Sequence, residues 1–148
     1  MADVRILVCD DSNLMRQLLV RMLEAEPGLE VIGEAADGHE CLLRILDWKP
    51  DLVLLDLEMP VQDGVACVAE ARRLGLDTPF LVIAEATTSE ARMQAALAAG
   101  AEGFLVRPHN VMQVEQIQPE LARRLQQFRA HHPQTQGTRT TLRPINSR

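Results

Sequence analysis

The chain has 148 residues, 47% of them hydrophobic, which fits one compact domain and excludes a wholly disordered chain. Its net charge of −6 lacks the basic excess of a nucleic-acid-binding domain. No apolar run reaches the roughly 18 residues of a membrane span, so we expect binding to neither membrane nor, given the charge, nucleic acid. Cys9, Cys41 and Cys67 show no Cys-x-x-Cys spacing, which predicts reduced core thiols in a cytoplasmic protein.

The first apolar run, residues 5–9, predicts a buried strand that ends on Asp10 and Asp11. Ser12 or Asn13 can cap the helix that follows, since both side chains accept hydrogen bonds from free backbone N–H groups. The apolar residues of this helix recur three and four positions apart, which predicts one buried face. That face consists of Met15, Leu18, Leu19, Met22 and Leu23.

A short second strand is predicted at residues 30–34, and a second helix follows it. Asp37 and Glu40 are three residues apart, as in a capping box, so they mark the start of this helix. Its predicted buried stripe is Cys41, Leu42, Ile45 and Leu46.

The third apolar run, residues 52–55, reads as a buried strand because it is too short for a helix, and it ends on Asp56. Pro60 fixes its own φ angle and Gly64 accepts a positive φ, so the loop after Asp56 should have a defined shape. A third helix over residues 64–74 is predicted to bury Val65, Val68 and Ala69.

A fourth strand is predicted at residues 80–84, and Thr87 with Glu90 resembles another capping box. The helix at residues 90–99 is rich in Ala and has few large apolar side chains. We therefore expect weak packing against the sheet, which makes this helix the candidate movable element.

A fifth strand is predicted at residues 103–106, closed by Arg107 and Pro108. The last helix has an interior Pro119, which removes a backbone donor and predicts a kink or two abutting pieces. Its apolar positions are Val114, Ile117, Leu121, Leu125 and Phe128. We expect one domain over residues 1–129 and a polar linker or disordered tail over residues 130–148.

Five strands alternating with five helices predict an α/β fold with a parallel sheet covered on both faces. Asp10, Asp11 and Asp56 all follow strand ends, where ligands bind in such sheets, and they form an acidic cluster if their strands are neighbours. Carboxylates at that density favour a hard cation such as Mg²⁺.

Residues 8–12, 55–64 and 100–108 resemble, in sequence and spacing, the receiver domains of two-component response regulators. The resemblance extends over roughly residues 3–128. It implies a doubly wound, flavodoxin-like sheet with strand order 2-1-3-4-5, which makes the first and third strands neighbours.

The resemblance also implies the roles of the acids. Asp56 would accept a phosphoryl group from a histidine kinase, and Asp11 would ligate Mg²⁺ directly while Asp10 holds it mostly through water. Asp56 itself and the backbone carbonyl of Glu58 would complete the protein's share of the metal ligands. The side chain of Glu58 either affects how water reaches the acyl phosphate or is a solvated surface acid.

Two positions depart from the family pattern. The Ser or Thr expected at the end of the fourth strand falls on Ala84 when counted from Pro79, and on Glu85 when counted back from Arg107. Thr87 or Thr88 could replace it only if the loop is reshaped. Arg107 stands at the Lys position and keeps the positive charge for a phosphate contact, although Arg and Lys are not interchangeable. Because neither Ala84 nor Glu85 has a hydroxyl, the resemblance does not imply signalling by the usual hydroxyl displacement.

Signalling in the family implies a changed contact surface on the helix at residues 90–99, the fifth strand and the last helix, through dimerisation or release of an output domain. Phe104 stands at the aromatic switch position, and a plain core Phe is the alternative. Residues 10–17 and 55–60 are similar to the regulatory domain of chemotaxis methylesterases, but no Gly-x-Ser-x-Gly-like motif is present, so we expect no enzyme activity in this chain.

Two other functions compete with the phosphoreceiver. A phosphorylation-independent interaction module is favoured by the missing Ser/Thr and Lys and opposed by the complete acids. A phosphatase with an aspartate nucleophile is suggested by Asp56-x-Glu58, but that chemistry needs a second Asp in place of Glu58, and a Thr or Val where Met59 stands.

Overall fold

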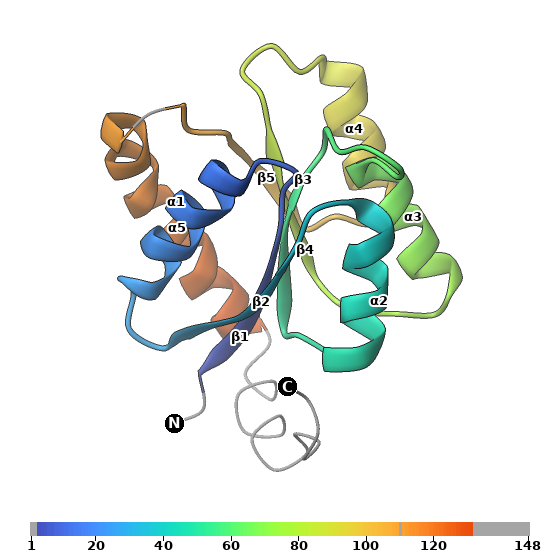
Figure 1. Ribbon diagram of the computed structural model, residues 1–148, viewed down its shortest axis with the longest axis horizontal. Helices are drawn as coiled ribbons and strands as arrows, with labels where there is room; N and C mark the ends of the chain where they lie inside the picture. The colour runs from blue at the N-terminus through green and yellow to red at the C-terminus, as the bar shows by residue number, and fades with distance from the viewer. Residues whose placement is uncertain (1–2, 110, 132–148) are drawn as a thin grey trace.

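Five parallel strands form one sheet with helices on both faces (Figure 1). The computed structural model describes residues 3–109 and 111–131. The strands are β1 (Val4–Cys9), β2 (Leu29–Ala35), β3 (Leu52–Asp56), β4 (Phe80–Ala84) and β5 (Gly103–Val106). The helices are α1 (Asn13–Glu24), α2 (Gly38–Trp48), α3 (Gly64–Arg73), α4 (Glu90–Ala99) and α5 (Val111–His131). The strand order is β2-β1-β3-β4-β5, which confirms the predicted fold class and topology.

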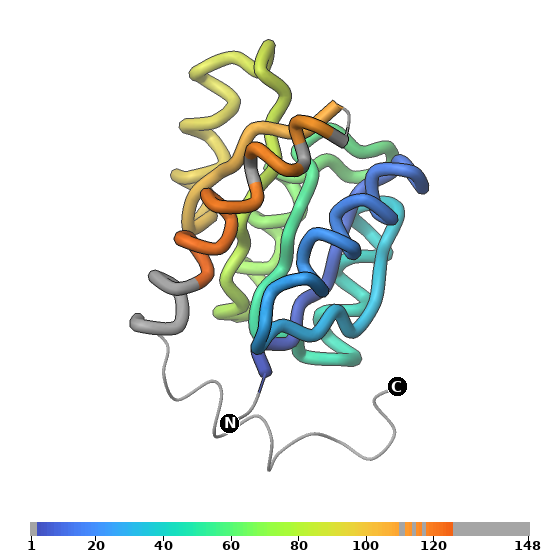
Figure 2. The backbone as a smooth tube through the Cα atoms, turned by 90° about the vertical axis from the view of Figure 1, so that its left-hand side faces the viewer, coloured from blue at the N-terminus to red at the C-terminus, as the bar shows by residue number. Residues whose placement is uncertain are grey.

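The sheet separates two helical layers. α1 and α5 lie side by side on one face, and α2, α3 and α4 cover the other (Figures 1 and 2). Successive strand residues point to opposite faces, so Ile6 and Val8 pack toward α1 while Leu7 and Cys9 pack toward α2. Every residue of β1, β3 and β4 is buried, as expected for strands covered on both sides.

Three thiols meet in the core between the sheet and α2 and α3. The Sγ atoms of Cys9 and Cys41 are 2.8 Å apart, and the Sγ of Cys67 lies 3.7 Å from the carbonyl oxygen of Gly38. All three are free and buried, and burial raises the pKa of Cys9 and of Cys41. The prediction that the three cysteines are core thiols is confirmed.

The buried faces of two helices differ from the predicted ones. In α2 the buried residues include Cys41 and Ile45, whereas Leu46 is 46% exposed. In α3 the buried set includes Cys67, whereas the predicted Ala69 is exposed. Helix residues follow one another at 3.6 per turn, so the face of α2 that buries Cys41 leaves Leu46 outside it, and the face of α3 that buries Cys67 leaves Ala69 outside it.

α4 is weakly packed, as predicted, because Ala96 is its only buried residue. The predicted capping box at Thr87 is wrong: Ser89 caps α4, and its hydroxyl accepts a hydrogen bond from Arg92 N–H at 3.1 Å. α5 runs as one helix through an exposed Pro119, so the two-piece alternative is wrong. The predicted tail at residues 130–148 lies outside the described residues, apart from the end of α5.

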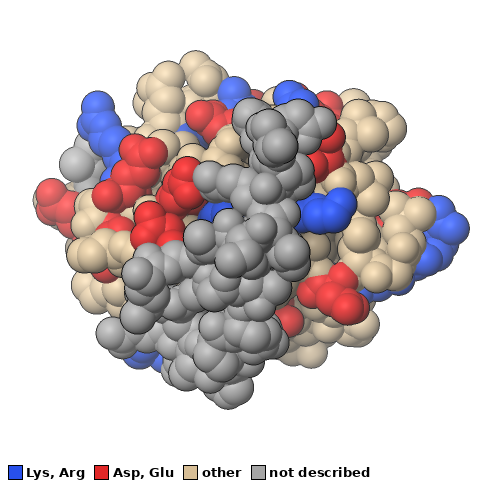
Figure 3. Space-filling view, turned by 90° about the horizontal axis from the view of Figure 1, so that it is seen from below, with Lys and Arg blue, Asp and Glu red and all other residues tan. Residues whose placement is uncertain are grey.

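Within residues 3–109 and 111–131, no helix is both long and apolar enough to cross a membrane. Figure 3 looks from below onto the end of the molecule opposite the carboxyl ends of the strands. Acidic and basic side chains are interspersed there around the part that is not described. On the visible, described part of this face the basic side chains do not form a continuous patch.

Candidate functional site

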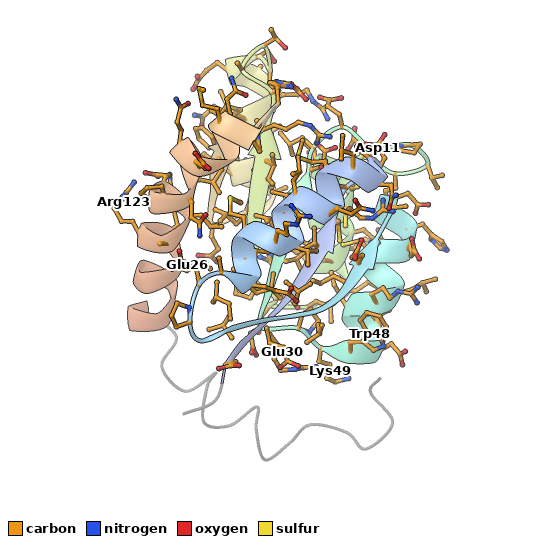
Figure 4. The ribbon with its side chains drawn as sticks, turned by 60° about the vertical axis from the view of Figure 1, so that its left-hand side comes forward. Asp11, Glu26, Glu30, Trp48, Lys49 and Arg123 are labelled. Atoms are coloured by element: carbon orange, nitrogen blue, oxygen red, sulfur yellow. The ribbon has the colours of Figure 1, made fainter. Side chains whose placement is uncertain are left out.

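The three predicted acids come together at the carboxyl end of the sheet. β1 pairs with β3, with Cys9 opposite Leu55, so the residues that follow, Asp10 and Asp56, lie next to each other. One carboxylate oxygen from each of Asp10, Asp11 and Asp56 lies within 4.8 Å of the others. In Figure 4, Asp11 lies at this end of the molecule and Trp48 and Lys49 at the opposite end.

Backbone groups fix two of these carboxylates. Ser12 N–H donates to Asp10 Oδ1 at 2.9 Å, and Glu58 N–H donates to Asp56 Oδ1 at 3.1 Å. Ser12 also caps α1, so the turn that starts this helix is the turn that orients Asp10. Asp10 and Asp56 are buried, whereas Asp11 is exposed and reaches the cluster from the solvent side.

The loop after Asp56 has a defined shape, but not for the predicted reason. Gly64 does not adopt a positive φ; a Cβ at this position would lie 2.7 Å from the carbonyl oxygen of Asp56, so glycine is required by close approach. The positive φ of the loop is instead at the exposed Val61, at 67°. Gly38 N–H of α2 donates to the carbonyl oxygen of Gln62, which ties the loop to the helical layer.

Arg92 links α4 to this same loop. Its Nε lies 3.0 Å from Glu58 Oε2, and its Nη2 lies 3.1 Å from the carbonyl oxygen of Leu57 and 3.4 Å from Asp63 Oδ2. The side chain of Glu58 is therefore ion-paired as well as solvent-accessible. One guanidinium thus connects the weakly packed helix to the residues that follow Asp56.

Arg107 enters the acid cluster from the end of β5. Its Nη1 lies 2.5 Å from Asp10 Oδ2 and 3.0 Å from Asp56 Oδ2, and its Nη2 lies 3.1 Å from Asp10 Oδ1. Only 10% of the Arg107 side chain is exposed, and Asp10 is fully buried. The bidentate fork expected of Arg is present, and in this structure it holds the two buried carboxylates.

Glu85 and Ala84 have different surroundings. Ala84 ends β4 next to Ile83, which pairs with Asp56, and its methyl group is buried in the core. Glu85 follows outside the strand, and its carboxylate pairs with Arg107 Nε at 3.2 Å and with His109 Nε2 at 3.0 Å. The negative charge at the second candidate hydroxyl position is therefore paired with the positive charge at the Lys position.

The remaining switch candidates lie around these groups. Thr87 is exposed in the loop before α4, and Thr88 donates its backbone N–H to the carbonyl oxygen of Glu85. Phe104 is half-buried and packs against the core on the α2 to α4 side of the sheet. Next to the outward side of Arg107 lies an open hollow lined mainly by Ala86, Val106, Pro108, His109 and Gln113.

The electrostatics of the cluster favour a bound cation. Burial and the negative charge of Asp10 raise the pKa of Asp56 to about 7, against the lowering effects of Glu58 N–H and Arg107. Burial also raises the pKa of Asp10, despite hydrogen bonds from Arg107 and Ser12. A second positive charge would stabilise both ionised carboxylates and lower both pKa values.

The donor set fits Mg²⁺. All three acids offer oxygen atoms, which this ion prefers, and the open side at the exposed Asp11 leaves room for the waters that it retains. The three carboxylate oxygens lie within 4.8 Å of one another, close enough for more than one acid to contact the same ion. Asp11, Asp56 and the backbone carbonyl of Glu58 are the groups that would hold the ion, with Asp10 beside them.

The role of Arg92 was not predicted from the sequence. Its contacts join α4 to a loop about 30 residues earlier in the chain, and only the fold brings the two together. Arg16 is similar: its Nη1 donates to the carbonyl oxygen of Asp10 at 2.7 Å, and its Nε pairs with Glu34. The available signal in the sequence was an arginine in the first turn of a helix that follows a strand, because such a helix start lies at the carboxyl edge of the sheet.

Residues 6–118 match the family model of the response regulator receiver domain. A protein-glutamate methylesterase/protein-glutamine glutaminase of Methanospirillum hungatei is 34% identical over 123 residues, which are 82% of this chain and 36% of that protein. Another, from Koribacter versatilis, is 43% identical over 106 residues, 71% of this chain and 29% of that protein. The chain thus spans about a third of the length of these curated relatives.

Solved structures give the same picture. The response regulator domain of CheB from Thermotoga maritima superposes with a TM-score of 0.77 at 30% identity, and the match covers 84% of this chain and 95% of that one. The CheX-CheY-BeF₃-Mg²⁺ complex of Borrelia burgdorferi includes a chain that matches with a TM-score of 0.67 at 29% identity, over 76% of this chain and 84% of that one.

Proposed function

This chain belongs to the response regulator receiver domain family, and we propose that it accepts a phosphoryl group on Asp56 from a histidine kinase in the presence of Mg²⁺. The observation that carries the proposal is the cluster of Asp10, Asp11 and Asp56 at the ends of two neighbouring strands. One of the similar solved chains belongs to a CheX-CheY-BeF₃-Mg²⁺ complex.

In the proposed transfer, a carboxylate oxygen of Asp56 attacks phosphorus as the bond from phosphorus to the donor's imidazole nitrogen breaks. The electron pair of that bond stays on the imidazole, and the phosphoryl group ends on Asp56 as an acyl phosphate. Mg²⁺, when bound, neutralises the oxygens of the phosphoryl group. Glu58 N–H holds Asp56 in place, and Arg107 pairs with Asp56 while the site is free of metal.

The signal would leave through the surface of α4, β5 and α5. Phosphorylation adds about −1.5 to −2 charge. This charge would compete with the present partners of Arg107 and of Arg92 for the two guanidinium groups. Exposed Val106 and Met112 give this surface apolar contacts for a second copy or for an output domain. Because the chain is similar to methylesterases, the proposed output is a tethered methylesterase domain. The receiver itself would be regulatory and not an enzyme. The free thiols fit a cytoplasmic location.

The direct test is incubation with Mg²⁺ and acetyl phosphate, followed by intact mass spectrometry, with Asp56→Asn as the matched control. We expect a phosphoryl mass increment in the wild type that the variant lacks and that EDTA abolishes. Equal uptake by both proteins would move the acceptor away from Asp56.

A second function, a phosphorylation-independent interaction module, is favoured by one observation. The buried methyl of Ala84 and the ion-paired Glu85 stand where the family has its hydroxyl. Mg²⁺ binding without any uptake of phosphoryl group would favour this function. Uptake that changes the association of the protein, measured by light scattering with Asp56→Asn beside it, would count against it.

A further inference from the structure

The two residues that depart from the family pattern are in direct contact. Glu85 Oε2 lies 3.2 Å from Arg107 Nε, while the other end of the same guanidinium contacts Asp10 and Asp56. We propose that Arg107 gates the acid site against divalent cations, and that Glu85 is the positioning residue that receives Arg107 when a cation enters. This inference rests on the proposed function, because the entering cation is the Mg²⁺ of phosphoryl transfer.

Arg107 occupies one oxygen of Asp56, a proposed metal ligand, and both oxygens of the neighbouring Asp10. Both oxygens of Asp10 and the Oδ2 of Asp56 are within 3.1 Å of guanidinium nitrogens. These three groups are nearly excluded from solvent, so water screens their charges weakly. A divalent cation competes with the guanidinium for the lone pairs of these oxygens, and the two positive centres repel each other at this distance. Cation binding therefore favours withdrawal of Arg107 from Asp56 and from at least part of Asp10.

The structure offers a destination on the outward side. The Glu85 carboxylate is 31% exposed, already holds Arg107 Nε, and is also paired with His109. Beside it lies the open hollow lined by Val106, Pro108 and His109, among others. The guanidinium can swing outward about its existing bond to Glu85, so its charge stays paired throughout the movement.

Glu85 contributes more to pairing Arg107 after the guanidinium has moved outward than before. With the site free of metal, Arg107 has three carboxylate partners, and with metal bound Glu85 is the partner that remains. Removing Glu85 therefore destabilises the metal-bound arrangement more than the metal-free one. Removing Arg107 frees the acids for the metal and leaves Glu85 without a role in binding.

The test is the dissociation constant of Mg²⁺, measured by isothermal titration calorimetry on the full chain. Arg107→Gln should bind Mg²⁺ about tenfold more tightly or better than wild type, because no cation has to leave first. Arg107→Lys should fall between the two, since an ammonium cannot bridge two carboxylates as a fork does. Arg16→Gln is the matched control. It removes the same charge, but Arg16 pairs with Glu34 and contacts Asp10 at its backbone oxygen, not at its carboxylate, so we expect less than about a twofold change.

Glu85 is tested by a double-mutant cycle. Glu85→Gln should weaken Mg²⁺ binding about three- to tenfold in the wild-type background and leave it unchanged in the Arg107→Gln background. An equal loss in both backgrounds would show that Glu85 attracts the metal as a simple negative charge, which overturns its positioning role.

Two outcomes separate the gate from the proposed function. Phosphoryl uptake by wild type, with the same Mg²⁺ affinity in Arg107→Gln and wild type, would overturn the gate and leave the function standing. An absence of Mg²⁺ binding by both wild type and Arg107→Gln would overturn both. If Arg107→Gln does not fold because Asp10 loses its partner, Arg107→Lys and its cycle with Glu85→Gln carry the same test.

Discussion

The carboxyl edge of the sheet has two halves built in different ways. At the ends of β1 and β3, three acids stand where the family pattern requires them, and backbone N–H groups of Ser12 and Glu58 fix two of them. At the ends of β4 and β5, a methyl, a carboxylate and a guanidinium replace the expected hydroxyl and ammonium. In this chain the groups that we propose to capture phosphate are complete, whereas the groups that would respond to it are rearranged.

The largest effect is expected in the first half, from Asp11→Asn. Asp11 is the exposed acid of the cluster, so its loss should cost at least about 100-fold in Mg²⁺ affinity while changing stability by less than about 0.5 kcal/mol. Calorimetric Mg²⁺ titration and urea unfolding measure the two quantities. Asp47→Asn, at an exposed site on α2, is the matched control and should change neither. A weakened fold in Asp11→Asn would mean that the acid is structural.

The pH dependence of stability separates the halves further. Because the pKa of Asp56 is about 7 in the folded chain and about 3.9 when unfolded, its ionisation removes stability as the pH rises through that interval. In EDTA, Asp56→Asn should therefore exceed wild type by on the order of 2 kcal/mol above pH 7, and this gain should disappear near pH 4. Urea unfolding at both pH values checks it. A gain that is constant with pH would show that Asp56 ionises normally in the folded state.

The next effect concerns Arg92, which joins the two halves through α4. Arg92→Ala removes the contacts to Glu58, Asp63 and Leu57, and should lower the protection of α4 amides by about 1 kcal/mol. Hydrogen exchange with mass spectrometry measures it. Arg123→Ala is the control, since Arg123 pairs within its own helix with Glu120. Equal protection in Arg92→Ala and wild type would show that α4 is held by its packing alone.

The smallest effects are expected from Ala84→Ser and Glu85→Ser, which test whether position 84 or position 85 corresponds to the missing hydroxyl. Ala84→Ser adds one polar atom to a buried site and should cost about 1 kcal/mol or less, while Glu85→Ser should leave stability within about 0.5 kcal/mol. The informative readout is whether phosphorylation then changes hydrogen exchange in α4 more than in wild type. We expect the gain from Ala84→Ser, because Ala84 follows the strand partner of Asp56. A larger change in hydrogen exchange in Glu85→Ser alone would favour Glu85, the position counted back from Arg107, as the hydroxyl position.

The strands and the acids could be predicted from the sequence because each depends on local pattern. Short apolar runs that end on Asp10 and Asp56 are visible without knowing the fold, and strand pairing follows from the family resemblance. The pairing of Glu85 with Arg107 was not predicted, since it depends on side-chain direction at the ends of two strands. The glycine requirement at Gly64 and the positive φ of Val61 depend on how closely the loop approaches β3, which no local pattern encodes.

The contact between Arg107 and Asp10 joins residues 97 positions apart, which is most of the length of the domain. Such distant contacts are slow to form and cannot form during synthesis until the later residue has left the ribosome. A nascent chain that has reached residue 100 already contains β1, β3 and the two buried acids of the cluster, Asp10 and Asp56, but not the guanidinium that neutralises them. The fifth strand therefore completes the charge balance of the core as well as the sheet, and a truncation before Arg107 would leave the first strands with uncompensated charge.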